Sequence, residues 1–351
     1  MINKRSAEYW EKRFEDILVN NEKLALEYEK ELAKIYKERS LEIEKELESF
    51  YQRYSKETGL DLSEVKKRLN PSQLKRFKTG QNAYLKYIDD LIKKGANLEA
   101  YKAQIEKLSA RAYVTKLQEL QANLNTQIMI LTGEQQVMLS EVMKQVYLQG
   151  FLKTMYEVQK GLGMGVSFTV PSNDDVLKIL KNPWNGNHYS NSIWTNKAKL
   201  TNWLNTDLPR HFAAGASNQK MAKDLAAKLD TNYKSAVRLV RTEVNYISNQ
   251  SSMDAYEESG VVDRYQILAT LDSRTSEICQ EMDGKIFNVN EKKVSVNMPP
   301  FHVHCRTTTV PYFDDDLDDE DLTRIARDKD GKSYYVPATM TYKEWAEQYG
   351  K

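Results

Sequence analysis

The side chains best suited to metal binding or nucleophilic chemistry gather in one short stretch of this 351-residue chain. Both cysteines, Cys279 and Cys305, fall there together with two of the four histidines, His302 and His304. Zinc takes four ligands from cysteine sulfur and histidine nitrogen, so these four residues are candidate ligands of a structural zinc ion. The same residues also allow a buried thiol pair whose loop is fixed by a histidine, or a disulfide.

Catalysis is the second kind of chemistry that these side chains allow. A thiolate of Cys279 or Cys305 beside His302 could act as a nucleophile, and His302, His304 and Asp272 could form a metal nuclease. A catalytic cysteine needs a third group to orient it, and the sequence specifies none. We therefore expect no enzyme activity, no catalytic residues and no cofactor besides the structural zinc. A Cys/His-dependent hydrolase or toxin-like enzyme stays an alternative function.

The stretch also carries an ordered set of short motifs: Asp272-x-Arg274-Thr275, Cys279, Asp283-Gly284, Pro299-Pro300-x-His302-x-x-Cys305-Arg306 and Pro311. Together they resemble the C-terminal signature of the phage Mu F-like head morphogenesis proteins, which are minor capsid proteins of tailed bacteriophages. Upstream, Arg241-Thr242-Glu243 followed by Asn245 and Asn249 is similar to the preceding helix of that family. The resemblance covers roughly residues 184–312. Thr307 stands where many relatives carry a further cysteine, and His304 replaces a commoner asparagine.

This resemblance implies a minor capsid protein that is associated with the portal vertex inside the head. It would act in head assembly and in the packaging or delivery of DNA. The implied partners are the phage portal protein, and also scaffolding and major capsid proteins and double-stranded DNA. The implied location is the host cytoplasm during assembly and then the interior of the virion. A plain DNA-binding protein is a further alternative.

Polar residues share one face of the helix that precedes the signature. Arg241, Asn245 and Asn249 are spaced by four, which places them on one side of a helix. We expect Arg241 and Glu243 to fix the turns around Asp272 and Arg306 by charge-assisted hydrogen bonds. Arg274, Asp283 and Gly284 complete this structural signature.

The bulk composition limits the class of protein. The net charge is only +1 although 29% of the residues are charged, so no general attraction to nucleic acid follows from charge. Two cysteines exclude a disulfide-rich scaffold. The first residues contain no apolar core of a signal peptide, and no apolar run is long enough to span a membrane. We expect a soluble protein of a reducing cytosol without a membrane anchor.

A long helix is predicted at the amino end, because residues 4–58 contain neither glycine nor proline. Apolar side chains recur there at steps of three and four, which forms a stripe along one helical face. We expect one long helix, or a pair broken near Asn20-Asn21. Another helix or another protein must cover the stripe, and we favour a partner, the portal protein.

Further helices are predicted over residues 61–159, and three glycines between Gly161 and Gly165 break the helical region there. From Lys66 to Lys116 there are thirteen lysines and arginines, which form either a solvated surface or one that faces DNA. Alternating apolar residues over 261–270 predict a strand. A short helix over 275–282 and short strands over 285–287, 294–298 and 307–312 complete this part.

The carboxyl end combines an acidic run with a short helix. Residues 314–321 contain seven acidic residues in eight and predict a solvated linker. Thr341 and Glu344 match the capping box of a helix. We therefore predict an elongated helical domain over 1–160, a Mu F-like domain of helices followed by a small sheet over 161–313, and a linker with a short helix over 314–351. The fold class is mainly α with a small α+β C-terminal domain.

Overall fold

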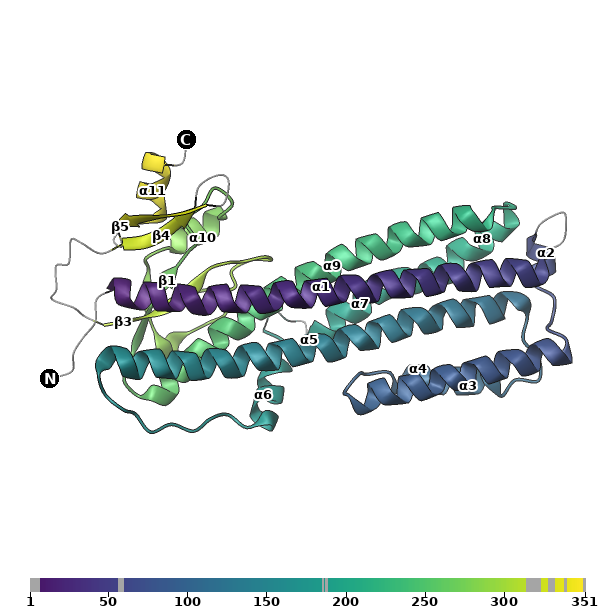
Figure 1. Cartoon of the computed structure of the whole chain (residues 1–351), viewed down its shortest axis with the longest axis horizontal. Coiled ribbons are helices and arrows are strands. Elements are labelled where there is room, and N and C mark those ends of the chain that lie inside the picture. Colours follow the sequence, from purple (N-terminus) through teal and green to yellow (C-terminus); the bar gives the residue numbers. More distant parts are fainter. Residues whose placement is uncertain are drawn as a thin grey trace. The chain divides into compact units, whose positions relative to one another are not determined.

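The computed structural model describes residues 7–55, 60–184, 186, 189–313, 323–327, 332–337 and 340–349. Helices dominate it, and two small antiparallel sheets lie near the carboxyl end of the chain (Figure 1). The helices are α1 (Ala7–Tyr54), α2 (Leu62–Val65), α3 (Pro71–Lys93), α4 (Glu99–Ser109), α5 (Lys116–Leu162), α6 (Asn173–Leu180), α7 (Tyr189–Asn202), α8 (Leu208–Ala213), α9 (Asn218–Ser259), α10 (Glu277–Met282) and α11 (Tyr342–Tyr349), with a π-helical turn η1 (Trp203–Asp207) and a 3₁₀ turn η2 (Val289–Glu291). The strands are β1 (Arg264–Leu268), β2 (Ile286–Asn288), β3 (Thr308–Tyr312), β4 (Thr323–Arg327) and β5 (Ser333–Pro337). The predicted fold class, mainly α with a small α+β part near the carboxyl end, is confirmed.

Helix α1 is one uninterrupted helix of 48 residues. It does not break near Asn20-Asn21. Asn21 is buried, and its Nδ2 donates a hydrogen bond to Oγ of Ser248 on α9 at 2.6 Å. The polar residue in the apolar stripe is therefore satisfied by a polar residue of another helix, and the helix continues through it.

The apolar stripe of α1 is covered by the chain itself. The side chains of Trp10, Phe14, Leu32 and Phe50 are each 2% exposed or less. Burying such a side chain stabilises the fold by about 1.5–3 kcal/mol, so the stripe contributes to the core of the protein. The expectation that this stripe waits for a partner protein is wrong, because side chains of the same chain already remove it from water.

The chain forms two compact units that combine segments distant in sequence. The first unit contains residues 1–27, 141–188 and 238–351, and the second contains residues 28–140 and 189–237. The core of the first unit includes Trp10, Val158, Met253 and Tyr265. The core of the second unit is a separate set that includes Ile88, Leu98, Tyr101 and Met129. The boundaries of these units differ from the predicted domain boundaries at residues 160 and 313. The division into three domains stays a prediction.

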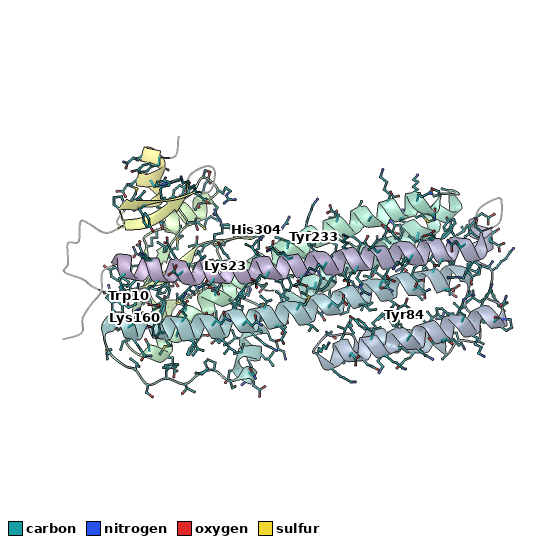
Figure 2. All side chains as sticks on the ribbon, viewed as in Figure 1. Trp10, Lys23, Tyr84, Lys160, Tyr233 and His304 are labelled. Carbon is teal, nitrogen blue, oxygen red and sulfur yellow. The ribbon has the colours of Figure 1, made fainter. Side chains whose placement is uncertain are left out.

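Helix α5 ends at Leu162, within the glycine-rich segment predicted to break the helical region. Gly163 has a φ of +66°, a left-handed conformation that glycine adopts at little cost. Gly161 has a different role. A Cβ atom there would lie 2.1 Å from Cη2 of Trp10, so only glycine leaves room for the indole. Figure 2 shows Trp10 beside Lys160, at the end of α5.

The three-stranded sheet has the order β2-β1-β3, and both pairings of the central strand are antiparallel. Tyr265 and Ile267 of β1 point into the core and are fully buried, as the alternation predicts. The predicted strand over 294–298 is wrong. Ser295 has a φ of +64°, and its N–H donates to the carbonyl of Met298 at 2.8 Å, so this segment forms a tight turn.

A second sheet, the hairpin of β4 and β5, was not expected from the sequence. It packs with α11 around Ala326, Val336 and Trp345. The predicted capping box of α11 is confirmed, because Glu344 accepts hydrogen bonds from the N–H and Oγ1 of Thr341 at 2.7 and 2.9 Å. The acidic run over 314–321 lies outside the described residues.

Candidate functional site

The register of β1 and β3 brings the two ends of the signature segment (residues 272–311) together. Leu268 pairs with Thr308 in the antiparallel ladder, so the residues after β1 lie beside those before β3. Asp272 and Arg306 meet there in a bidentate ion pair. The guanidinium Nη1 and Nη2 donate to Oδ2 and Oδ1 of Asp272 at 2.5 and 2.7 Å. The Asp272 side chain is only 4% exposed.

Asp272 holds its negative charge despite this burial. Burial raises the pKa of this carboxyl, but the hydrogen bonds and charge of Arg306 outweigh it and lower the pKa to about 2. Oδ1 also accepts hydrogen bonds from the backbone N–H of Arg274 at 2.9 Å and from Oγ1 of Thr275 at 3.2 Å. The Arg274 guanidinium is 3.6 Å from Oδ2, but its side chain is 73% exposed, so its contribution is small.

Asp283 and Gly284 form the predicted turn after α10. Gly284 has a φ of +77°, in the left-handed region, and the N–H of Lys285 donates to the carbonyl of Met282. The buried carboxylate of Asp283 accepts hydrogen bonds from the N–H of Ala269 and the N–H of Tyr342, both at 2.9 Å. One carboxylate therefore links the end of β1 to the start of α11.

Neutral side chains of α9 hold the loop before β3. Nδ2 of Asn245 and Nδ2 of Asn249 both donate to the carbonyl of Thr307, at 3.0 and 3.3 Å. Oγ1 of Thr242 accepts a hydrogen bond from the N–H of His304 at 3.2 Å. Thr242, Asn245 and Asn249 follow a spacing of three and four, so they share one helical face. The sequence motif contains all three residues, but it does not predict that Thr242 holds the loop.

Glu243 contacts a different partner from the predicted turns around Asp272 and Arg306, and the predicted role of Arg241 stays a prediction. Arg241 is exposed, whereas Glu243 is 4% exposed. Glu243 accepts a hydrogen bond from Nε1–H of Trp184 at 3.1 Å, and the Trp184 ring stacks on Tyr246. Burial raises the pKa of Glu243 to about 7, although the hydrogen bond from Trp184 lowers it. Glu243 is thus a buried acid that fastens the segment after α6 to α9.

Cys279, His302 and Cys305 form a thiol–imidazole cluster. Sγ of Cys279 lies 3.2 Å from Nε2 of His302 and 3.7 Å from Sγ of Cys305. All three donor atoms lie within 4.8 Å of one another. Cys279 comes from α10, and the other two residues come from the loop before β3. Phe301 of that loop and Ala269, just after β1, pack against the two cysteines. Both sulfur atoms belong to buried, free cysteines.

The cluster favours one thiolate. Hydrogen bonding to Cys279 lowers the pKa of Cys305; burial opposes this shift, and His302 adds to it. Hydrogen bonding to Cys305, together with burial, raises the pKa of the Cys279 thiol. Hydrogen bonding to Cys305 also raises the pKa of His302, although burial opposes it. A negative sulfur beside an imidazole is the donor set that divalent zinc prefers.

His304, the fourth predicted ligand, is not part of this group within the residues that the structure describes. Its φ is +62°, and its side chain is exposed (Figure 2). The structure therefore brings together three of the four candidate ligands.

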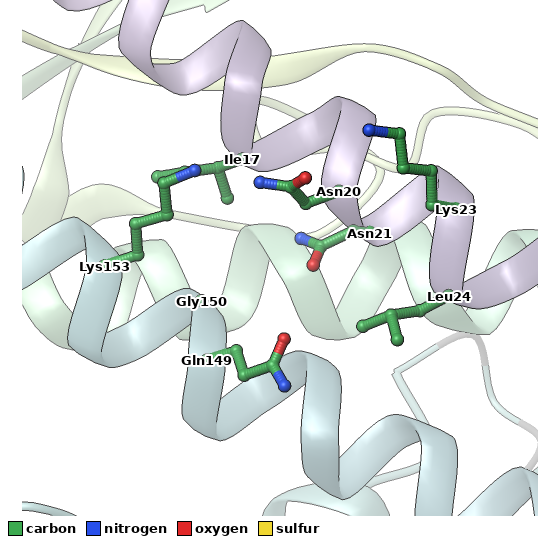
Figure 3. Close-up of a pocket in the computed structure, with 8 residues that line it drawn as sticks. All are labelled: Ile17, Asn20, Asn21, Lys23, Leu24, Gln149, Gly150 and Lys153. Carbon is green, nitrogen blue, oxygen red and sulfur yellow. The ribbon is translucent and has the colours of Figure 1, made fainter.

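A separate hollow of about 250 Å³ lies in the first unit between α1 and α5 (Figure 3). Polar side chains dominate its lining, which consists of Ile17, Asn20, Asn21, Lys23, Leu24, Gln149, Gly150 and Lys153. Gly150 allows α5 to approach α9 closely, because a Cβ atom there would lie 2.3 Å from Oγ of Ser251. Since Asn21 is already bonded to Ser248, this hollow reflects helix packing, and the signature segment remains the candidate site.

Residues 202–310 match the family described as phage Mu protein F like protein. This range includes the Asp272–Arg306 ion pair and the whole thiol–imidazole cluster. The chain is also similar to two characterised proteins. It is 25% identical over 227 residues to a minor head protein of Bacillus phage SPP1, and the match covers 60% of this chain and 71% of that protein.

The second relative is an NAD(+)–arginine ADP-ribosyltransferase of Enterococcus faecalis. It is 24% identical over 210 residues, which is 56% of this chain but only 42% of the transferase. The chain thus spans less than half of the transferase. No solved structure matches the chain significantly.

The family match over residues 202–310 and the similarity to a minor head protein both support a phage Mu F-like minor head protein. Residues 202–310 are thus a phage Mu F-like region, and the likeness of the chain to a minor head protein points to the virion. Among the described helices, none combines the length and the apolar character that crossing a membrane requires.

Proposed function

We propose that this protein is assembled into the phage head in the host cytoplasm and resides at the portal vertex, on the inside of the capsid. There it takes part in head assembly and in the packaging or delivery of DNA. The observation that carries the proposal is the Asp272–Arg306 site, which lies inside the residues matched to the phage Mu F-like family. The similarity to a minor head protein over 71% of that protein's length supports the same role.

The proposed partner is the portal protein, and the interface must use surfaces other than the apolar stripe of α1. That stripe is buried within the chain. Deleting residues 1–160 would remove α1 and nearly all of α5, which supply core side chains such as Trp10 and Val158. Such a deletion would unfold the protein, so binding has to be tested with the full chain.

Co-expression with the portal protein of the same phage tests the proposal. A tagged portal protein should capture the full untagged chain, and the two should elute together on size exclusion at raised salt. The matched control is a tagged portal protein of an unrelated phage, which should capture none. Recovery of the chain in the unbound fraction, while the cognate portal protein assembles normally, would contradict portal association.

We further propose that the protein acts without catalysis. The activity of the transferase belongs to a protein that this chain covers only in part. The sulfur atoms of the cluster are on residues that are 2% and 3% exposed, which disfavours attack on a large substrate. Incubation with labelled NAD(+) and arginine-containing acceptors should transfer no ADP-ribose. Nuclease and protease assays should not distinguish wild type from Cys305→Ser.

Contact with double-stranded DNA is part of the proposed role in delivery. The basic region between Lys66 and Lys116 is partly neutralised, because Lys67 and Lys116 pair with Glu64, and Lys102 pairs with Asp89. Phosphate contacts make affinity fall steeply with salt. Duplex binding that is weak and vanishes at moderate salt is expected for the isolated chain, and tight binding independent of salt would contradict it.

A further inference from the structure

We propose that Cys279, His302 and Cys305 are three protein ligands of one zinc ion, with a solvent molecule in the fourth position of the isolated chain. Binding would replace the thiol protons, which pass to solvent, and would leave two thiolates and a neutral imidazole on the metal. This assignment is independent of the proposed role in the phage head. It differs from the four-ligand site expected from the sequence, because it excludes His304.

The separations within the cluster fit a tetrahedral zinc ion. With zinc–sulfur bonds of about 2.3 Å, two sulfur ligands of a tetrahedron lie about 3.8 Å apart. The two Sγ atoms here are 3.7 Å apart. A disulfide would require about 2.0 Å, so the two sulfur atoms are not joined. The imidazole Nε2, at 3.2 Å from Sγ of Cys279, has to retreat by only a few tenths of an ångström to its tetrahedral distance of about 3.6 Å.

The orientation of His302 provides a second, independent argument. Its Nδ1 lies 2.8 Å from the carbonyl oxygen of Val303, which can only accept a hydrogen bond. Nδ1 therefore carries the proton, and the lone pair of the neutral ring is on Nε2, which faces the sulfur atoms. Histidines that bind metals usually donate their other ring N–H to a carbonyl or carboxylate in this way.

The surroundings of the sulfur atoms suit a metal-bound thiolate. Ala269 and Phe301 pack against the two cysteines and keep bulk water away from them. The two sulfur atoms are therefore already held close together, and the site does not have to be rebuilt on binding.

The fourth position is left to solvent because of where His304 lies. Its backbone N–H is held by Thr242 on α9, and its side chain is exposed. His302 is only half-buried, so the cluster is reached by solvent on its imidazole side. Three protein ligands with an open position distinguish this site from a closed four-ligand structural site.

Zinc content of the full chain tests the assignment. After incubation with excess zinc and removal of unbound metal, wild type should retain one zinc ion per chain by elemental analysis. His302→Ala and Cys305→Ser should each weaken zinc affinity by more than about tenfold. His304→Ala is the matched control, and it should retain the metal with unchanged affinity. A wild-type chain that retains no zinc, or a His304→Ala variant that loses as much as His302→Ala, would overturn the site.

Cobalt substitution keeps the test informative if a cysteine variant fails to fold. Cobalt(II) bound to wild type should show a thiolate-to-metal charge-transfer band and the visible bands of a tetrahedral ion. Added imidazole should shift the visible bands by replacing the solvent molecule. Absence of the charge-transfer band would refute thiolate ligation, and visible bands that imidazole leaves unchanged would refute the open fourth position.

Discussion

Replacing Asp272 with asparagine should destabilise the protein by several kcal/mol, because it breaks the buried ion pair with Arg306 and leaves the shape of the side chain intact. The amide oxygen of Asp272→Asn can still accept from the N–H of Arg274 and from Thr275, as Oδ1 does now. Its NH₂ group then faces Nη1 of Arg306, where Oδ2 accepts a hydrogen bond at 2.5 Å. Two donors would oppose each other in a buried site.

The expected magnitude follows from two contributions. The pKa of Asp272 is lowered from 3.8 to about 2, and at about 1.4 kcal/mol per pKa unit the charge contributes about 2 kcal/mol to the free energy of unfolding. A donor left without an acceptor costs about 1–3 kcal/mol more. We expect a total loss of about 3–5 kcal/mol, the range measured when one partner of a buried ion pair is removed.

The loss of stability caused by Asp272→Asn should depend on pH. Because the pKa is lowered in the folded state, the stabilisation by Asp272 is fully present above about pH 4 and is lost as the pH falls toward about 2. The difference between wild type and Asp272→Asn should therefore shrink between about pH 5 and about pH 3. Urea unfolding at both pH values, followed by circular dichroism, measures it.

The control for this prediction is Arg274→Ala, which removes the exposed partner of the same carboxylate. It should cost less than about 1 kcal/mol, because its side chain is 73% exposed. The double variant Asp272→Asn/Arg306→Met should be less destabilised than the sum of its single changes. Equal losses for Asp272→Asn and Arg274→Ala, or a difference from wild type that does not change with pH, would refute the reasoning.

Two further predictions concern packing and burial. Gly161→Ala should destabilise by about 1–3 kcal/mol in thermal or urea unfolding, because its Cβ would meet Trp10 at 2.1 Å. Gly80 lies in α3, where an added Cβ atom would meet no other atom within 4 Å, so Gly80→Ala should stabilise the protein by about 0.5–1 kcal/mol. A Gly161→Ala variant more stable than Gly80→Ala would contradict the packing around Trp10. Glu243 has a pKa raised to about 7 by burial, so its ionisation costs stability as the pH rises from about 4.5 to about 7. Relative to wild type, Glu243→Gln should gain about 3 kcal/mol between about pH 4 and about pH 8 in the free energy of unfolding, and a difference independent of pH would contradict the buried acid.

Local signals in the sequence predicted the elements that depend on local chemistry. The absence of glycine and proline through residues 7–54 predicted α1, and the alternation over β1 predicted a half-buried strand. The Thr341–Glu344 capping box predicted α11. In each case the residues that decide the structure are neighbours in the chain, so their pattern can be read without the tertiary fold.

The remaining features depend on distant parts of the chain. The burial of the α1 stripe required knowing that side chains of α5 and α9 lie against it. The contact of Thr242 with the loop depends on which face of α9 meets the segment before β3. The turn at Ser295 looked like a strand because its apolar residues alternate, but a positive φ at one position ended the strand pattern.

The zinc site also combines features that the sequence predicts with one that only the tertiary structure shows. Residue types and order placed Cys279, His302 and Cys305 in one candidate set. Only the structure separates His304 from them, because adjacent side chains on a turn can point in different directions. Whether the His304 side chain faces the cluster therefore depends on the local backbone geometry, which the sequence alone does not give.

The composition of purified virions tests the central claim most directly. Particles of the phage that encodes this chain, purified on a density gradient and treated with protease to remove surface contaminants, should contain the intact chain by mass spectrometry. It should be protected until the heads are opened, and heads made without it should be defective in assembly or DNA delivery. Infectious particles that lack the chain, produced in normal yield, would contradict its role as a minor head protein.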